Sequence, residues 1–386
     1  MKVIFYVQHL LGIGHLVRAS RLADALDKAG HDVTIVSGGM PVQGFPSEAL
    51  KLIQLQPLCS ADSGFSGLAD AQGVPADEAL FSARKLALLD TFEQLSPDCL
   101  IIEAYPFARR QMRFELVPLL DHAASLPSGR RPMVVSSIRD ILQPKSPERD
   151  VATAEIVNRY FDLVMVHGEE SVAPLRETFS AADLIAGRVV YTGMVGPCSN
   201  DNSYAESHDV VVSAGGGSVG EDLLVAAVEA HKLINLQDAK WLLLAGPNLP
   251  EQAYQRLRDV ASLNINVVRF HPNLAGMLKN ARVSVSQAGY NTVADVLAAG
   301  CASVLVPFSA HGEREQTIRA QRLSDAGRAA LIEQSDLTPL RLAGAIQQAM
   351  IQHDARAFAP MAMDGAQQSA RLLAVRYQQF KRDQSA

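Results

Sequence analysis

The stretch from Val283 to Gly300 (VSVSQAGYNTVADVLAAG) constrains the fold more than any other part of the chain. Its alternating valines and serines predict a short strand, Gly289 permits a tight turn, and the apolar helix that follows ends at Gly300. We expect Asn291 or Thr292 to cap this helix. A strand that leads through a glycine into a helix directs several unpaired backbone N–H groups, and the positive end of the helix dipole, at one place. The stretch therefore predicts an anion site.

Asp295 lies three residues after Thr292, so we expect it near the same end of the helix as the cap. Two interpretations of this carboxylate stay open. It accepts hydrogen bonds from the hydroxyls of a ligand, or it completes a capping box, with aspartate in place of glutamate, that serves the helix alone.

The alternation of strands and helices predicts an α/β protein made of two doubly wound, Rossmann-like domains with a cleft between them. A strand over 2–7, a helix over 15–29 and a strand over 32–37 open the chain, and the pattern restarts with a strand over 209–213. A chain of 386 residues also exceeds one ordinary core. The expected parts are an N-terminal domain over 1–192, a glycine- and proline-containing linker over 193–203, a C-terminal domain over 204–362, and a helix over 363–386 that can cross back to the first domain. Further strands are expected at 52–55, 99–102, 133–136, 163–166, 240–244, 265–269, 302–306 and 329–332, a helix is expected to start at 107, and residues 60–73 are expected to form a mobile loop.

Charge and cysteine content narrow the class of protein. The formal net charge of −6 argues against a nucleic-acid binder, which needs a surplus of lysine and arginine. The four cysteines are scattered without a C-x-x-C pair, so neither a zinc site nor a disulfide framework is indicated. No apolar run is long enough to span a bilayer, and we expect a cytoplasmic protein. Arginine clusters at 109–113 and 130–131 are typical of solvated surfaces, but they leave peripheral attachment to the inner membrane as an alternative.

A glycine-rich loop, GGGSVG over 215–220, follows the predicted strand at 209–213 and opens a helix, which is the context of a phosphate-binding loop. A dinucleotide site needs an acidic residue at the end of the next strand, but that strand ends in Leu244-Ala245-Gly246-Pro247. The loop GIGH over 12–15 lacks the third glycine, and no G-K-[ST] motif occurs. Nicotinamide enzymes, kinases and ATPases are therefore disfavoured.

Two glycine turns that feed helix N-termini in one domain suit a diphosphate. Asp295 then lies where a ribose would meet it, and the side chains of Glu315 and Gln316 are able to hydrogen-bond the hydroxyls of a sugar. A glycosyl nucleotide satisfies all of these features.

Five segments of the second half share a characteristic pattern of glycines and polar residues: 216–220 (GGSVG), 269–274 (RFHPNL), 289–295 (GYNTVAD), 298–300 (AAG), and 307–308 with 311–316. Together they resemble the donor-binding half of GT-B glycosyltransferases, in particular the MurG-like group of glycosyltransferase family 28. This group includes the peptidoglycan N-acetylglucosaminyltransferase. The resemblance covers most of residues 209–330 and continues more loosely through 12–15.

The resemblance implies an inverting, metal-independent transfer from a nucleotide sugar, most often a UDP-sugar, which is a substrate and not a resident cofactor. The family's paired glutamines stand here as Glu315-Gln316, which leaves the donor sugar undetermined. The implied donor contacts are Gly216, Gly217, Ser218 and Gly220 on phosphate, Phe270 and His271 on the base, Asp295 on the ribose, and Glu315 and Gln316 on the sugar, with Gly289, Asn291 and Thr292 at the second turn.

His15 is the residue that we expect to act as general base. It follows Gly14 at a helix N-terminus, where the dipole disfavours an imidazolium and keeps the ring neutral. Closure about the linker would bring this ring to the anomeric carbon. The alternative is a histidine that caps the helix or contacts phosphate. Gly12, Gly14 and Arg18 are expected in the same acceptor or phosphate loop.

Other polar residues follow first-domain strands. Glu103, Arg139 and Asp140 are expected near the cleft edge, either as turn or cap residues or as contacts to the acceptor. His9, His167 and His311 lie near strand ends without metal-ligand spacing, so no metal site is indicated.

The motif GIGHLVR over 12–18 also resembles the N-terminal loop of nucleotide-sugar hydrolases of the same fold, in which the histidine activates water. A UDP-sugar hydrolase is therefore the alternative function. An epimerase is disfavoured because no pair of carboxylates is placed for it, and a non-catalytic nucleotide-sugar sensor belongs to a different class. The acceptor is left open among lipid-linked, glycan and small-molecule hydroxyls, as is the oligomeric state.

Overall fold

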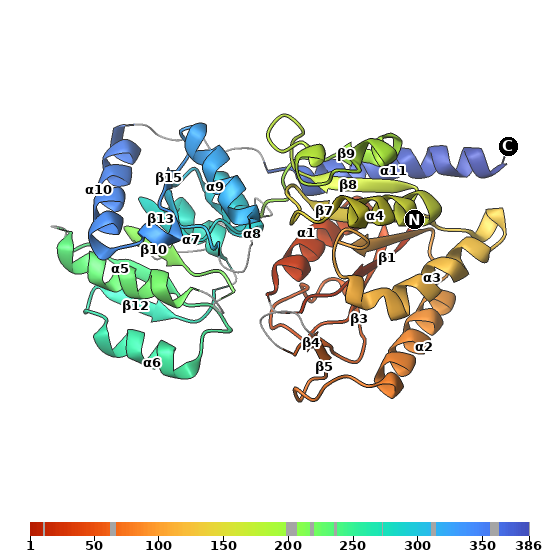
Figure 1. The fold of residues 1–386 in the computed structure, drawn as a ribbon, viewed down its shortest axis with the longest axis horizontal. Helices are drawn as coiled ribbons and strands as arrows, with labels where there is room; N and C mark the ends of the chain where they lie inside the picture. Colours follow the sequence, from red (N-terminus) through yellow and green to blue (C-terminus); the bar gives the residue numbers. More distant parts are fainter. Residues whose placement is uncertain are drawn as a thin grey trace. The chain divides into compact units, whose positions relative to one another are not determined.

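The computed structural model describes the chain apart from residues 11, 62–66, 198–206, 217–219, 235–237, 272, 310–313, 356–362 and 386, and apart from the side chains of 352–355 and 385. The chain forms two compact units (Figure 1). The first contains Met1–Val195 and Asp364–Ala386, and the second contains Gly196–Met363. Each unit is an α/β domain with a doubly wound parallel sheet, as the sequence predicts.

The sheet of the first unit has seven parallel strands in the order β3-β2-β1-β6-β7-β8-β9. The central strands β1, β6 and β8 are buried along nearly their whole length, as expected where both faces of a sheet are covered, whereas the edge strand β3 is mostly exposed. A separate hairpin pairs β4 (Cys59–Ser60) with β5 (Leu68–Ala69), so part of the expected mobile loop is a short antiparallel ladder. The strands are β1 Lys2–Val7, β2 Asp32–Ser37, β3 Lys51–Gln54, β6 Cys99–Glu103, β7 Met133–Arg139, β8 Leu163–His167 and β9 Val189–Tyr191.

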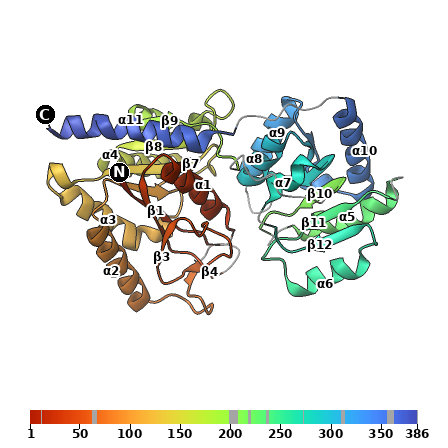
Figure 2. The same ribbon diagram turned by 180° about the vertical axis from the view of Figure 1, so that it is seen from behind.

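The helices of this unit lie on both faces of the sheet. The order in which the strands are connected reverses between β1 and β6, so right-handed crossovers place the helices on the two sides of this point on opposite faces of the sheet. One face carries an apolar core shared with α2 (Glu78–Leu95), α3 (Arg113–Ser125) and α4 (Pro147–Tyr160). On the other, α1 (Gly14–Lys28) lies against α11 (Gly365–Ser385), and the views from the front and the back agree (Figures 1 and 2).

The terminal helix α11 belongs to the first unit through specific contacts. The Tyr377 hydroxyl donates to Oδ1 of Asp98, which precedes β6, at 2.7 Å. Leu373 and Ala370 are buried on the same helix. The antiparallel bridge between Val195 and Asp364 brings the two segments of this unit together at the backbone.

The second unit has a six-stranded parallel sheet in the order β12-β11-β10-β13-β14-β15. The main core packs α5, α6 and α10 on one face, and a smaller core packs α7 and α8 on the other. The strands are β10 Val210–Ser213, β11 Trp241–Leu244, β12 Ile265–Val268, β13 Val283–Ser286, β14 Ala302–Leu305 and β15 Ala330–Leu331; the helices are α5 Glu221–Leu233, α6 Glu251–Val260, α7 Leu274–Lys279, α8 Tyr290–Ala299, α9 Glu315–Asp325 and α10 Pro339–Ala355.

The central stretch forms the predicted strand β13 and helix α8, and Gly300 ends the helix in the left-handed conformation, with φ 68°. The predicted caps are wrong. Gly289 is the N-cap, with an extended backbone (φ −65°, ψ 146°), and no side chain caps the helix. Because the helix starts at Tyr290, Asn291 and Thr292 lie inside its first turn, and the capping-box interpretation of Asp295 fails with them.

Three other segments differ from the sequence-based expectation. Helix α3 starts at Arg113 and not at residue 107, because Arg109 adopts the left-handed conformation (φ 61°) and breaks the helical path. Strand β7 continues to Arg139, three residues beyond its expected end. Strand β9 immediately precedes the expected linker and was not predicted. Among the described residues, no helix is long and apolar enough to cross a membrane.

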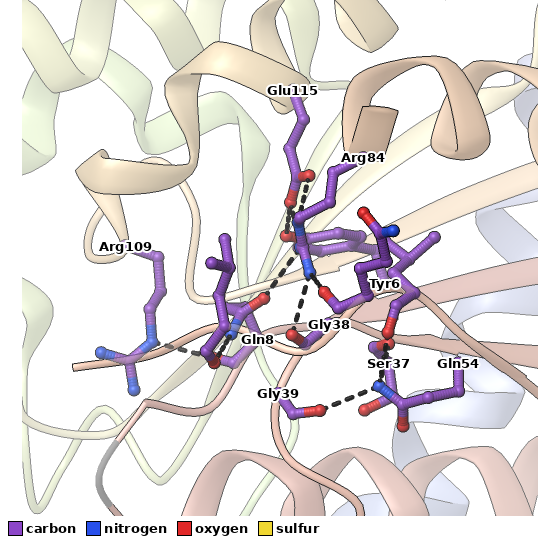
Figure 3. A network of polar contacts seen from close by, with 12 residues as sticks. Tyr6, Gln8, Ser37, Gly38, Gly39, Gln54, Arg84, Arg109 and Glu115 are labelled. Atoms are coloured by element: carbon purple, nitrogen blue, oxygen red, sulfur yellow. Dashed lines mark hydrogen bonds and ion pairs between the residues drawn. The ribbon is translucent and has the colours of Figure 1, made fainter. Parts of the chain in front are cut away.

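A buried ion pair between Arg84 and Glu115 lies next to the loops that follow β1 and β2 (Figure 3). The Arg84 and Glu115 side chains are both fully buried, and two hydrogen bonds join them at 2.7 and 3.0 Å. Arg84 also donates to the Gly38 carbonyl at 3.0 Å and to Oε1 of Gln8 at 3.1 Å. The Tyr6 hydroxyl donates to the same carboxylate. The guanidinium of Arg84, on α2, thus donates to the residues that follow β1 and β2.

The Gln54 side chain extends this network to β3. Its amide donates to the carbonyls of Ser37 and Gly39 at 3.0 and 2.9 Å. Arg109 donates to the Gln8 carbonyl at 2.9 Å on the other side (Figure 3). The loops that leave neighbouring strand ends are therefore fixed relative to one another, including the segment that leads into α1.

We expect Arg84→Met to lower the free energy of unfolding by about 3–5 kcal/mol, because it leaves a buried carboxylate without its cation. The matched variant Arg159→Met removes an exposed arginine that pairs with Asp121, with side chains 70% and 50% exposed. It should cost less than about 1 kcal/mol. Urea denaturation monitored by circular dichroism measures both. Equal losses would contradict the role of the buried pair.

Candidate functional site

The first candidate site surrounds His15, in the first turn of α1 after the β1 strand end. Its Nδ1 lies 3.1 Å from Oε1 of Glu103, the last residue of β6. The His15 side chain is 16% exposed, whereas the Glu103 side chain is fully buried. Strands β1 and β6 are the neighbours at which the sheet order reverses, and open α/β sheets bind ligands there. The pair therefore presents one imidazole edge at the expected ligand position.

Two further groups hold the Glu103 carboxylate. The Arg18 guanidinium donates to Oε1, and the Ser137 hydroxyl donates to Oε2 at 2.8 Å. Burial raises the pKa of Glu103, but Arg18, His15 and Ser137 outweigh burial and lower its pKa to about 2. The carboxylate therefore stays ionised inside the protein.

His15 is neutral at physiological pH, as the sequence predicts, but for a different leading reason. Burial and then the positive charge of Arg109 lower its pKa to about 3, against the raising effect of Glu103. Because an ionised carboxylate only accepts hydrogen bonds, Nδ1 carries the ring proton. The neutral ring then has its lone pair on Nε2. This is the tautomer that a general base requires.

The other residues predicted at this edge have separate roles. Arg18 was expected to contact an acceptor or phosphate, but its side chain is buried and donates to Glu103. Asp140 is buried and accepts from the Ile141 N–H at 2.8 Å, which is a turn role. Arg109 is half-buried; burial first and then Arg139 lower its pKa to about 10. Two guanidinium groups therefore give this end of the sheet a positive potential.

Sequence reasoning left Glu103 between a turn residue and an acceptor contact, and missed its pairing with His15. The two are 88 positions apart in the chain. Only the pairing of β1 with β6 brings them together. The single signal in the sequence was a carboxylate at the end of an otherwise apolar strand.

The second candidate site lies where the sheet order of the second unit reverses, between β10 and β13. Ser213 pairs with Ser286 in register at the ends of these strands, so the two predicted glycine turns leave from adjacent positions. Gly215 has φ 62°, and a Cβ on Gly220 would lie 2.3 Å from the Cβ of Ala214. Both positions therefore require glycine.

Gly217 and Ser218, which were predicted to hold phosphate, lie outside the described residues. Gly216, the third residue of this prediction, accepts from the Asn248 N–H at 3.2 Å through its carbonyl.

Gly289 differs from these two glycines. A Cβ at this position would meet no atom of the described residues within 4 Å, and its φ of −65° suits any residue. The protein itself therefore does not require a glycine at the N-cap of α8. Open space in front of a helix N-terminus is what a bound anion needs.

Arg319 on α9 holds this turn and was missed from the sequence. It donates to the Ala288 carbonyl at 2.8 Å and to Oε1 of Glu315 at 2.7 Å, and it lies over the Tyr290 ring at 5.7 Å. The i, i+4 spacing of Glu315 and Arg319 was the available signal.

The residues expected at the sugar and the base lie on three elements. Glu315 is buried against Arg319, and Oε1 of Gln316 accepts from the Phe308 N–H at 3.1 Å, so protein groups engage both predicted sugar contacts. Phe270, 40% exposed, and His271 follow β12. The His271 Nδ1 accepts from the Asn273 N–H at 3.1 Å, and burial lowers the pKa of this ring.

Asp295 lies in the second turn of α8 with 6% of its surface exposed. Because the helix begins at Tyr290 and not at Asn291 or Thr292, Asp295 does not lie at the end of the helix. Among the described residues, no three histidine, cysteine, aspartate or glutamate side chains gather as metal ligands.

Residues 210–377 match the glycosyltransferase family 28 C-terminal domain. Three relatives carry the name UDP-N-acetylglucosamine--N-acetylmuramyl-(pentapeptide) pyrophosphoryl-undecaprenol N-acetylglucosamine transferase. The one from Gluconobacter oxydans is 26% identical over 85% of both chains. The Xanthomonas oryzae relative is 34% identical over 47% of this chain and 38% of its own, and the Vibrio atlanticus relative is 36% identical over 27% and 29%. The chain thus spans less than two fifths of the latter two relatives.

Solved structures show the same fold. MurG from Acinetobacter baumannii superposes with a TM-score of 0.59 at 18% identity, over 97% of this chain and all of that one. A ugt transferase from Siraitia grosvenorii in complex with UDP gives 0.60 at 16% identity, with both chains fully covered. The glycosyltransferase VinC in complex with dTDP gives 0.52 at 16%, over all of this chain and 96% of its own. These neighbours share the GT-B arrangement of two Rossmann-like domains.

We expect the His15 ring to stay neutral from pH 8 to pH 5, because its pKa is lowered to about 3. Nitrogen-15 NMR of labelled protein should show ring shifts that do not change over this range, with the His15→Ala variant identifying the signal. The urea-unfolded chain, in which the ring titrates near about 6.5, is the control. Since only the unfolded ring takes up a proton in this window, His15 should also make the fold less stable as pH falls below about 6.5. A His15 titration near neutral pH would contradict the neutral assignment.

Proposed function

Because this chain is a MurG-like GT-B glycosyltransferase in its fold and its C-terminal domain, we propose that it transfers a sugar from a nucleotide sugar to an acceptor hydroxyl, with His15 as general base. The contact of 3.1 Å between Nδ1 of His15 and the buried carboxylate of Glu103 is the observation that carries this proposal, because an ionised Glu103 would hold the ring proton on Nδ1. The unprotonated Nε2 takes the hydroxyl proton as the oxygen attacks the anomeric carbon. The bond between that carbon and the diphosphate breaks on the opposite side, so the configuration inverts. Glu103 stabilises the imidazolium that forms.

The donor in this proposal binds the second unit. Helices α5 and α8 follow the adjacent ends of β10 and β13. The N–H groups at the N-termini of these two helices would bind the two phosphates of a nucleoside diphosphate. The same positive helix ends stabilise the departing diphosphate, so no step of this proposal uses a metal ion. Asp295 and Phe270 are the proposed ribose and base contacts.

The proposed donor is a UDP-sugar. The names of the relatives specify UDP-N-acetylglucosamine, and one structural neighbour holds UDP. UDP-N-acetylglucosamine is thus the first donor to test. Glu315 stands in place of a glutamine of the family, and its carboxylate is engaged by Arg319, which makes a different hexose the next candidate.

The proposed acceptor carries an anionic group. Arg109 and Arg139 give the His15 end of the first sheet its positive potential. The relatives' names specify a pyrophosphoryl-undecaprenol acceptor, whose diphosphate has the matching charge. To reach a lipid-linked diphosphate, the protein would have to bind at the cytoplasmic face of the inner membrane.

We expect His15→Ala to lower turnover by about 10²–10⁴-fold while the affinity for UDP stays within about twofold, because the base acts only in the transfer step. Radiolabelled UDP-N-acetylglucosamine with a bacterial lipid extract measures transfer, and calorimetry measures UDP binding. His122→Ala is the matched control, since it removes a surface histidine that also pairs with a glutamate, Glu93. Retained transfer in His15→Ala would remove this residue from the mechanism. Rapid release of free sugar without acceptor would overturn the transferase proposal.

We expect Gly289→Ala to fold normally and to bind UDP about tenfold more weakly or worse, because the added methyl group enters space that the protein leaves open for the diphosphate. Gly187→Ala is the matched control, because a Cβ there also meets nothing within 4 Å and its residue lies in the other unit. Thermal melting checks folding, and calorimetric titration with UDP, GDP and dTDP checks binding. Unchanged affinity in Gly289→Ala would place the diphosphate elsewhere.

A further inference from the structure

A line of buried polar side chains crosses the first sheet from His15 to the far side of β8. Ser137 and His167 are fully buried, Thr192 is 4% exposed, and Glu103 is 1% exposed. Glu103 pairs with Ser137 in register between β6 and β7. Burial of so many polar groups in a sheet interior is costly unless each finds a partner.

Each neighbour in this line is within hydrogen-bond distance of the next. Oγ of Ser137 lies 2.8 Å from Oε2 of Glu103 and 2.9 Å from Nε2 of His167. Nδ1 of His167 lies 2.8 Å from Oγ1 of Thr192. With the contact of 3.1 Å between Glu103 and His15, the line joins helix α1, the three strands β6, β7 and β8, and the residue that follows β9.

The direction of every hydrogen bond in the line follows from the chemistry of the groups. The Ser137 hydroxyl has one proton and gives it to the ionised Glu103. His167 must then donate from Nε2 to Ser137. Since the His167 ring is neutral, its Nδ1 accepts. The Thr192 hydroxyl donates to it at 2.8 Å, because its other possible acceptors, the carbonyls of Val166 and Gly193, lie farther away at 3.5 and 3.3 Å. All donors therefore point toward Glu103, and so does Nδ1–H of His15.

Burial keeps His167 neutral, with its pKa lowered to about 3. The charged groups that face this ring are Arg18 from α1, which also lowers the pKa, and Glu103 and Asp140, which raise it. A neutral ring is required for the line to keep one direction, because a protonated His167 would need an acceptor at both nitrogens.

We propose that His167, with Ser137 and Thr192, is a positioning residue for the general base: the line holds the Glu103 carboxylate in the one orientation that keeps the His15 proton on Nδ1 and its lone pair on Nε2. This inference rests on the proposed function of His15. Removal of an inner link frees Oε2 of Glu103 to rotate toward other donors. In the transfer step, the O–H bond of the acceptor breaks and the proton joins Nε2 of His15, while the electron pair of the broken sugar bond leaves with the nucleoside diphosphate. No proton moves along the line.

The line has only one accessible end. The His15 side chain is 16% exposed, and every other member is buried. Valine or leucine in place of Ser137, His167 and Thr192 would avoid the cost of burying these polar groups, and the residue just before His167 on β8, Val166, is apolar. These polar residues are connected to the His15 imidazole through Glu103. The property to measure is therefore whether they fix the tautomer and orientation of that ring.

The test uses the full chain and two pairs of variants. Thr192→Val removes the outermost donor with little change of volume, and Thr192→Ser restores it. His167→Leu removes the central link, and His167→Gln keeps an N–H donor toward Ser137. Thr153→Val is the matched control, because Thr153 is a buried threonine whose hydroxyl donates to the carbonyl of Arg149 within α4, at 2.8 Å, outside the line.

Three measurements are made on each variant: kcat for sugar transfer, UDP affinity, and the nitrogen-15 ring shifts of His15, which report its tautomer. We expect His167→Leu to lower kcat about 10-fold to 100-fold and Thr192→Val to lower it by a smaller factor, with partial recovery in the conservative variants. UDP affinity should be unchanged. The His15 shifts should move from the Nδ1–H form toward a mixture of tautomers in the same order as the kcat losses.

Unchanged His15 shifts in a folded His167→Leu or Thr192→Val variant would overturn the positioning role, as would a loss of kcat of the same size in Thr153→Val. The NMR measurement needs no substrate. A wild-type chain that transfers no sugar but shows the Nδ1–H tautomer, lost in these variants, would therefore count against the proposed function alone.

Discussion

The buried carboxylate of Glu103 is the constraint on which the first unit depends. A negative charge inside a sheet is tolerated only when donors surround it, and here one guanidinium, one hydroxyl and one imidazole do so. The parallel pairing of β1, β6 and β7 brings these donors from distant parts of the chain to one strand end. The same charge that the protein must neutralise then holds the ring proton of His15, whose side chain is 16% exposed.

The second unit meets a similar requirement with backbone groups. Its two turns leave from paired strand ends at the reversal of the sheet order, where two helices begin. Gly220 is required by close packing on Ala214, whereas a Cβ at Gly289 would contact none of the described residues. Arg319 fixes the second turn from a third element. A neutral imidazole and a set of N–H groups are thus positioned on separate units by the same type of sheet topology.

Local signals in the sequence predicted most elements to within a few residues, including β1, β2 and β13, because apolar runs and glycine stops are short-range features. They failed where a backbone conformation decided the outcome, as at Arg109 and at the Gly289 cap. They also predicted a neutral His15. Its partner Glu103, and the burial of Arg18, depend on pairings across more than 80 positions that no local pattern contains.

The two units are not completed in the order in which they begin along the chain. Residues 196–363 are inserted between Val195 and Asp364, whose backbones pair, so the first unit is interrupted and then resumed by α11. During synthesis, the face of α1 that α11 covers stays exposed while the whole inserted unit is made. The inserted unit, continuous in sequence, is free to finish folding first. The half that begins earliest is therefore the last to become whole.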